Sequence, residues 1–204
     1  MDHSLAITLF RHGMTEANNR REYLGWTDSP LLQEEQEKWV EADYDVVYCS
    51  DLPRCEKTAA LLFPKSTPIR MVDLREMNFG DWEGKTYQEL VDEPSYQDFL
   101  AHPYEASPPN GESFSAFSTR VQRGWNHIVE DISERGIRQA AVMTHGGVIR
   151  YLLSKLAVEK KEFWEWNVPH SQGYQFTWNS NQSVRRGERC TSLQVVATTA
   201  KQNG

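Results

Sequence analysis

Two short apolar runs in this chain are each followed closely by a histidine and a glycine. The runs occupy residues 5–10 and 140–144, and the histidines are His12 and His145. Apolar runs of this length, bounded by glycine, are typical of strands buried inside a sheet. Other short apolar runs alternate with segments of helical pattern, which predicts an α/β fold with a mostly parallel sheet. Such sheets bind ligands beyond the carboxyl ends of their strands, where both histidines are expected.

The rest of the chain supplies further strands and helices. Strands are expected over residues 45–49, 69–72, 174–178 and 190–196, and helices over residues 33–42, 52–63, 86–100, 113–135 and 148–156. The helix over residues 113–135 has the clearest pattern, because its apolar residues recur every three or four positions. Thr15 is expected to cap a short helical turn, and Ser50 or Asp51 to cap the helix that follows them.

Residues 77–112 fit the alternation of strands and helices least well. This segment has three prolines between residues 102 and 111, a further proline inside its helical stretch, and Lys85 as its only basic side chain apart from histidine. The length of 204 residues is typical of one domain. We therefore predict a single domain over residues 1–204, in which residues 77–112 are a candidate cap, or lid, over the carboxyl ends of the strands.

Composition narrows the classes of function. The net charge of −7, from 22 basic and 29 acidic residues, argues against nucleic-acid binding, which requires a basic face. No stretch approaches the roughly 18 apolar residues of a membrane span. The start of the chain lacks the basic region of a signal peptide, so the cytoplasm is the expected location. The three cysteines have no metal-binding spacing and are expected as free thiols, and no HExxH, Walker, GxSxG or GxGxxG motif occurs. Neither a metal nor a cofactor is therefore expected.

Charged residues near the two histidines point to phosphate chemistry. Arg11 precedes His12, and Arg54 lies near the start of a predicted helix, where anions are favoured. Arginine suits bidentate phosphate contacts. A neutral imidazole can attack a phosphate monoester while arginines neutralise its oxygens and an acid protonates the leaving alcohol. The spacing does not choose the acid, because the loop over residues 73–84 contains four candidates. They are Asp73, Glu76, Asp81 and Glu83.

Six segments, in order along the chain, together resemble one known family. They are 9–18 (LFRHGMTEAN), 25–31 (GWTDSPL), 50–59 (SDLPRCEKTA), 74–84 (LREMNFGDWEG), 110–113 (NGES) and 142–147 (VMTHGG). They resemble the motifs of the histidine phosphatase superfamily, the phosphoglycerate-mutase-like proteins. Two of these segments, 74–84 (the acid loop) and 110–113 (the GES turn), look like those of its phosphatase branch, the α-ribazole phosphatases and broad-specificity phosphatases. The resemblance implies a three-layer α/β/α sandwich.

The resemblance also implies the catalytic roles. His12 becomes the nucleophile that forms phosphohistidine. Arg11, Arg54 and His145 hold the phosphoryl group. Glu76 becomes the general acid and then the base that activates water.

Five further positions are implied as substrate-binding residues. Asn18, Thr15 and the Gly146 N–H group are expected to contact phosphate, and Gly25 opens the glycine-containing loop of the second motif. Met14 departs from the family, which usually has Glu or Gln at this position. We expect this change to make the rim of the pocket more apolar.

The resemblance predicts a metal-independent phosphomonoesterase that acts on a small phosphorylated metabolite. The acidic, aromatic composition of residues 77–112 favours a monophosphate with an uncharged or apolar leaving group, such as α-ribazole phosphate, or a broad range of substrates. One alternative is a cofactor-dependent phosphoglycerate mutase-type phosphotransferase. A second is a protein that binds phosphorylated metabolites without turnover, although His12 and Glu76 are both present. Three placements are open for Trp164 and Trp166, namely the core, the lining of the cap and an interface, and the core is favoured. The oligomeric state is left open.

Overall fold

A six-stranded sheet organises the computed structural model, which describes residues 4–34, 38–39, 43–197 and 199–200. The strand order is β4-β3-β5-β1-β6-β7. The strands are β1 (Leu5–Arg11), β3 (Val46–Ser50), β4 (Ile69–Met71), β5 (Gln139–Thr144), β6 (Gln172–Trp178) and β7 (Ser192–Ala197). Strands β4, β3, β5 and β1 are parallel, whereas β6 is antiparallel to both of its neighbours. The predicted α/β fold with a mostly parallel sheet is confirmed.

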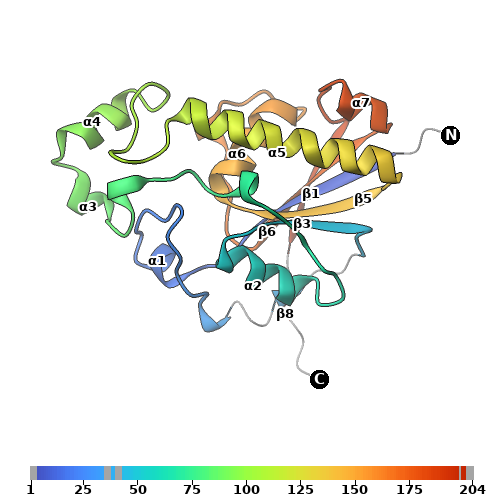
Figure 1. The fold of residues 1–204 in the computed structure, drawn as a ribbon, viewed down its shortest axis with the longest axis horizontal. Coiled ribbons are helices and arrows are strands. Elements are labelled where there is room, and N and C mark those ends of the chain that lie inside the picture. Colours follow the sequence, from blue (N-terminus) through green and yellow to red (C-terminus); the bar gives the residue numbers. More distant parts are fainter. Residues whose placement is uncertain (1–3, 35–37, 40–42, 198, 201–204) are drawn as a thin grey trace.

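Helices cover both faces of this sheet (Figure 1). Helices α5 (Phe114–Arg135), α6 (Gly146–Leu156) and α7 (Asn181–Arg185) lie on one face, and α2 (Pro53–Leu62) lies on the other. Strand alternation divides the core accordingly: Leu5 and Ile7 belong to the cluster of α5 and α6, whereas Phe10 packs with the buried residues of α2. The predicted three-layer α/β/α sandwich is therefore confirmed.

Local chemistry explains where the long helices begin and end. Pro53 is the first residue of α2, where its missing N–H group costs no hydrogen bond. The Ser113 hydroxyl caps α5 by accepting a hydrogen bond from the Ala116 N–H (3.1 Å). Gly136 ends α5 in the left-handed region, with φ of 65°, which glycine adopts without steric cost.

Three expectations about local structure are wrong. Lys38–Trp39 form strand β2, paired with β8 (Thr199–Ala200), where a helix over 33–42 was expected; residues 35–37 and 40–42 lie outside the described residues. Neither Ser50 nor Asp51 caps α2, because His145 and Arg75 take up their side chains. The helix expected over residues 86–100 is two helices, α3 (Tyr87–Leu90) and α4 (Pro94–Ala101), because proline cannot continue a helix from the preceding turn.

Residues 77–112 lie at one end of the molecule, beside the start of α5 (Figure 1). Buried aromatic residues of the segment belong to the main core cluster, and the Trp82 ring centroid lies 5.2 Å from that of Tyr96 and 5.1 Å from that of Phe99. Tyr87 and Tyr104 are instead exposed. Its function as a cap stays a prediction. In the described part of the chain, no helix is long and apolar enough to cross a membrane.

Candidate active site

The pairing of β1 with β5 brings the two motif histidines together. Arg11 lies opposite Thr144 in the parallel register, so His12 and His145 leave the sheet side by side. Their ring centroids are 5.1 Å apart, and both side chains are buried. The shared position predicted from the two apolar runs is confirmed.

The environment of His12 keeps its ring neutral. Its Nδ1 lies 2.7 Å from the Gly13 carbonyl oxygen, which can only accept, so Nδ1 carries the proton and Nε2 keeps a free lone pair. Burial, followed by the charges of Arg54 and Arg11, holds the pKa of His12 well below its usual range. A buried neutral imidazole with a free Nε2 lone pair is suited to nucleophilic attack.

His145 has protein partners at both ring nitrogens. Arg54 Nη2 lies 3.2 Å from Nδ1 and must donate, because guanidinium has no acceptor; Nε2 therefore carries the proton and donates to Ser50 Oγ at 2.9 Å. Burial, then the charge of Arg54, lowers the pKa of His145 well below its usual range. In this arrangement His145 orients Arg54, and its direct contact with phosphate stays a prediction.

Arg54 is buried and Arg11 is half-buried, and the hydrogen-bonding groups of both are only partly satisfied. Arg54 donates to the carbonyls of Gly25 (2.6 Å) and Thr27 (2.9 Å), and Arg11 donates to the carbonyl of Val168 (2.5 Å). The Nε atom of each arginine is buried without a hydrogen-bond partner among the described residues. Burial lowers the pKa of Arg11 to about 10, which leaves it charged at neutral pH. Two charged donors without acceptors are costly to bury unless an anion binds them.

Two glycines let α6 start against the site. Gly146 is the first residue of α6, and a Cβ atom there would lie 3.2 Å from the Arg11 Cζ atom. The Gly147 N–H donates to Glu76 Oε2 at 2.9 Å. Gly25 permits a closer approach elsewhere, because a Cβ there would lie 2.9 Å from the Phe79 amide nitrogen and nearer still to the Met77 carbonyl oxygen. The amino end of a helix favours anions, so this start faces the site with suitable polarity.

Glu76 is the acidic loop residue that reaches the site. Its carboxylate accepts hydrogen bonds from the amides of Met77 (3.0 Å) and Gly147 (2.9 Å). Its charge acts on Arg11 and on Arg54, raising the pKa of both against the lowering effect of burial. This placement favours Glu76 as the carboxyl group that serves the reaction.

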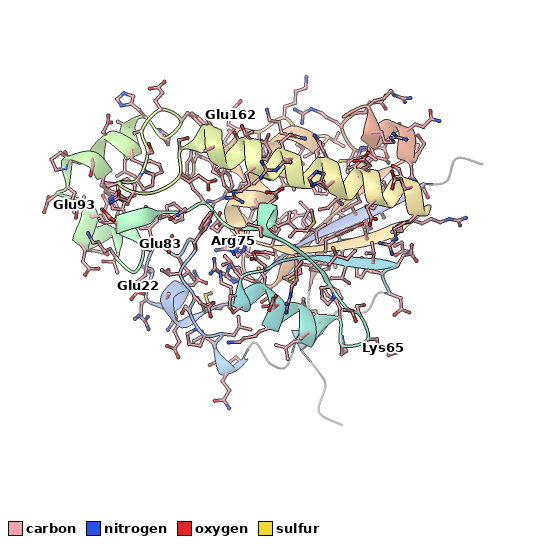
Figure 2. The ribbon with its side chains drawn as sticks, in the orientation of Figure 1. Glu22, Lys65, Arg75, Glu83, Glu93 and Glu162 are labelled. Atoms are coloured by element: carbon pink, nitrogen blue, oxygen red, sulfur yellow. The ribbon has the colours of Figure 1, made fainter. Side chains whose placement is uncertain are left out.

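The other three candidates have structural partners instead. Asp73 forms a bidentate pair with the exposed Arg123, and Asp81 accepts from the Asn110 side-chain Nδ2 at 3.0 Å. Glu83 accepts from backbone amides of two loops and so ties residues 25–27 to residues 76–83. Figure 2 places Glu83 between the central sheet and the segment that contains α3 and α4.

Some of the groups expected to bind substrate at the first motif already form hydrogen bonds within the protein. The Thr15 hydroxyl, fully buried, donates to Asn18 Oδ1 at 2.8 Å and accepts from the Asn18 amide at 3.2 Å, which forms the predicted cap of α1 (Glu16–Asn19). The Met14 carbonyl accepts from the Leu32 amide at 2.9 Å, and the Met14 side chain is half-buried. Contacts of Asn18, Thr15 and Met14 with substrate stay predictions.

The structure adds two basic residues that the sequence analysis did not select. The His170 ring lies 5.2 Å from the His12 ring, and its Nδ1 lies 3.2 Å from the His12 carbonyl oxygen. Arg150, in α6, donates to the Trp166 carbonyl at 3.0 Å, and its charge adds to the lowering of the Arg11 pKa. Arg150 falls one helical turn after Gly146, a spacing that places it on the same side of the helix.

An aromatic cavity of about 70 Å³ lies beside Glu76 and Gly147. Six aromatic side chains line it: Phe79, Phe99, Phe114, Phe117, Phe163 and Trp164. Arg150 also lines the cavity, so one cation faces a largely apolar space. Trp164 is 48% exposed, so its expected place in the core is wrong, whereas Trp166 is buried as expected. Within the described ranges, no three His, Cys, Asp or Glu side chains cluster as a metal site would require.

Comparison with known proteins identifies the family. The model of the histidine phosphatase superfamily (branch 1) matches residues 7–187. This chain belongs to that superfamily. A curated relative, the adenosylcobalamin/alpha-ribazole phosphatase of Escherichia coli K12, is 32% identical over 177 residues, covering 80% of this chain and 85% of the relative. Another, a 2,3-bisphosphoglycerate-dependent phosphoglycerate mutase of Bartonella henselae, is 25% identical over 197 residues, covering 87% and 94%.

Solved structures of related proteins share the fold of this histidine phosphatase. The alpha-ribazole phosphatase of Shigella flexneri superposes with a TM-score of 0.76 at 26% identity, covering 97% of this chain and 95% of that one. A phosphoglycerate mutase of Bacillus anthracis has a TM-score of 0.73 at 21% identity, covering 98% and 93%, and it supports the fold alone. The predicted phosphoglycerate-mutase-like fold, the family and its phosphatase activity are therefore confirmed.

Proposed function

We propose that this phosphatase hydrolyses phosphate monoesters without a metal, through a phosphohistidine at His12. One observation carries the proposal: Arg11 and Arg54 each hold a buried Nε–H group without an acceptor among the described residues, beside a neutral His12. A phosphoryl group supplies the acceptor oxygens that these two donors lack. Charge-assisted hydrogen bonds of this kind are stronger than those between neutral groups.

The reaction proceeds in two steps. In the first, His12 Nε2 attacks phosphorus, the ester P–O bond breaks, and the leaving oxygen takes its electron pair and the proton of Glu76. In the second, the Glu76 carboxylate takes a proton from water, the hydroxide attacks phosphorus, and the P–N bond breaks. Inorganic phosphate leaves, and His12 and protonated Glu76 are regenerated. The family resemblance and the hydrogen bond from Gly147 to Glu76 support this assignment.

The aromatic cavity supports a leaving group that contains an aromatic ring. It adjoins Glu76, the proposed donor of the leaving-group proton, and is lined mainly by aromatic side chains. We therefore propose small aromatic monophosphates as substrates, α-ribazole phosphate among them. We also propose a cytoplasmic location.

A mutase must hold a second anionic group of its substrate. Lys85, the basic residue of the proposed cap, pairs with Glu93 at 3.3 Å, and Figure 2 places Glu93 in the outlying part of that segment.

Hydrolysis of an aryl phosphate in excess EDTA, by the wild-type protein and by His12→Ala, tests the reaction. We expect turnover and an acid-labile phosphoenzyme with the wild type and neither with the variant. Metal-dependent turnover, or equal activity of the variant, would contradict the proposal. Transfer of phosphate to an added alcohol or phosphoglycerate in preference to water would indicate the mutase-type alternative.

Trp164→Ala tests the proposed leaving-group site. We expect an increased KM for aromatic monophosphates and an unchanged KM for alkyl monophosphates, because only the former reach the cavity. Tyr87→Ala is the control, since Tyr87 is an aromatic residue of similar exposure that lies in α3 and does not line the cavity. Equal effects of both substitutions would argue against the aromatic site.

A further inference from the structure

Arg120, in α5, is a buried arginine whose five N–H groups all have acceptors. Two of them reach the Glu112 carboxylate, at 3.0 and 2.7 Å. The other three reach the backbone carbonyls of Asp73 (3.0 Å), Arg75 (3.0 Å) and Glu76 (3.2 Å). One planar side chain therefore holds three carbonyls of a four-residue segment that ends on the proposed acid.

Glu112, the ion-pair partner of Arg120, also contacts the chain on the carboxyl side of Glu76. Its carboxylate accepts from the Asn78 amide at 3.3 Å, and its own amide donates to the Asn78 carbonyl at 2.8 Å. The Arg120–Glu112 pair thus contacts the chain before and after Glu76. In the ion pair the two side chains are only 10% and 12% exposed, so water competes little for these bonds.

Contacts at Trp26 and at Gly124 stiffen this arrangement. The Trp26 indole N–H also donates to the Glu76 carbonyl, at 2.8 Å, and Arg120 lies over the Trp26 ring at 5.8 Å. Gly124 lies one turn after Arg120, and a Cβ there would come within 2.7 Å of the Asp73 Cβ. Helix α5 therefore approaches the acid loop as closely as glycine allows.

We infer that Arg120, paired with Glu112, is the positioning residue that fixes the Glu76 carboxylate for proton transfer. A buried ion pair is weak evidence of stability, because desolvation offsets much of its attraction. Its fixed geometry is the property that matters here. Lysine has the same charge but no planar fork, so it cannot hold the three carbonyls and the carboxylate together. The inference rests on the proposed function of Glu76 as the acid.

Arg120→Lys should impair proton transfer without weakening the phosphate site. The rate of His12 phosphorylation is measured in the burst phase for aryl and alkyl phosphates of increasing leaving-group pKa. We expect less than a twofold change with the best leaving group and a loss of about 10- to 100-fold with the poorest, because a displacement of about 1 Å costs up to about 100-fold. The inhibition constant of inorganic phosphate should change less than twofold.

Arg123→Lys is the matched control. Arg123 lies on the same helix and pairs with the Asp73 carboxylate, but at the surface and without contact to the backbone of the loop. We expect a leaving-group dependence like that of the wild type. An equal loss for all leaving groups in Arg120→Lys, a wild-type dependence there, or the same change in the control would overturn the inference.

Two further measurements keep the test decisive. If Arg120→Lys does not fold, Glu112→Gln replaces it, because the amide keeps the shape and one acceptor oxygen of Glu112. If Glu76→Gln slows esters of good and poor leaving groups equally, the proposed acid is wrong, and the positioning claim is then judged by hydrogen exchange. Selectively faster exchange of amides 73–78 in Arg120→Lys supports positioning of the loop, whereas unchanged or uniformly faster exchange overturns it.

Discussion

Gly147 offers the sharpest single-atom test of the acid. A Cβ atom at this position would lie 3.2 Å from the Glu76 Cδ atom and closer still to Oε1, inside van der Waals contact. The Phe117 Cζ atom, at 3.4 Å, is at ordinary contact distance and need not move. The obstacle to Gly147→Ala is therefore the end of a flexible side chain, so the fold can tolerate the substitution.

The expected cost is catalytic. The carboxylate must retreat by about 1 Å, and a displacement of that size costs about 100-fold in rate, or about 2.7 kcal/mol of transition-state stabilisation. The hydrogen bond from the Gly147 amide to Glu76 is lengthened at the same time. Alanine is favoured over glycine in helices by about 1 kcal/mol, so Gly147→Ala should unfold at the same temperature as the wild type or slightly higher.

The assay compares kcat/KM for phosphate esters that differ in leaving-group pKa. Gly146→Ala is the matched control, because its Cβ would meet Arg11 at 3.2 Å and not Glu76. We expect Gly147→Ala to steepen the leaving-group dependence at constant inhibition by inorganic phosphate. Gly146→Ala should weaken phosphate inhibition at constant dependence. Identical behaviour of the two variants, or full activity of Gly147→Ala toward poor leaving groups, would refute this account of the site.

Three other outcomes are expected. The acid limb of kcat/KM, corrected for substrate ionisation, should have its midpoint below pH 6.5, because burial and nearby cations lower the pKa of His12; an acid limb with its midpoint at or above pH 6.5 contradicts this. The free energy of unfolding should decrease as pH drops below about 6.5, since the unfolded chain then binds protons that buried His12 and His145 do not; urea unfolding at pH 7.5 and 5.5 measures it, and His145→Asn should reduce the difference. Glu83→Gln should weaken phosphate inhibition and lower the melting temperature, because Glu83 binds the Trp26 and Thr27 amides beside the carbonyls that hold Arg54; calorimetry and inhibition constants check both.

The sequence predicted the residues that depend on local pattern and parallel register. His12 and His145 could be paired because each follows a buried run, and parallel strands end at one edge of a sheet. The order of the elements along residues 113–156 followed from helical spacing and from glycine. These signals lie within about twenty residues of the groups that they place, so they are readable without the fold.

The missed residues act across long sequence separations. Ser50 was read as a helix cap, but its hydroxyl meets His145, 95 positions away. Arg120 lies among the apolar positions of a long helix. A charged residue on the apolar face of a helix indicates a buried hydrogen-bond acceptor nearby. Its backbone acceptors, the carbonyls of Asp73, Arg75 and Glu76, carry no sequence information, because every residue has a carbonyl. Such contacts follow from tertiary packing alone.

Arg54, the proposed phosphate-binding residue, and Glu76, the proposed acid, are both held by residues 25–27. Residues 25–27 accept two hydrogen bonds from Arg54 through the carbonyls of Gly25 and Thr27. The same segment contributes the Trp26 indole N–H to the Glu76 carbonyl. Glu83 holds the segment in place by accepting hydrogen bonds from the backbone amides of Trp26 and Thr27. A displacement of residues 25–27 would therefore move the cation that binds the phosphoryl oxygens and the acid that protonates the leaving group together. Because both groups must meet one substrate at once, a single rigid segment keeps their separation fixed where two independent loops would let it vary.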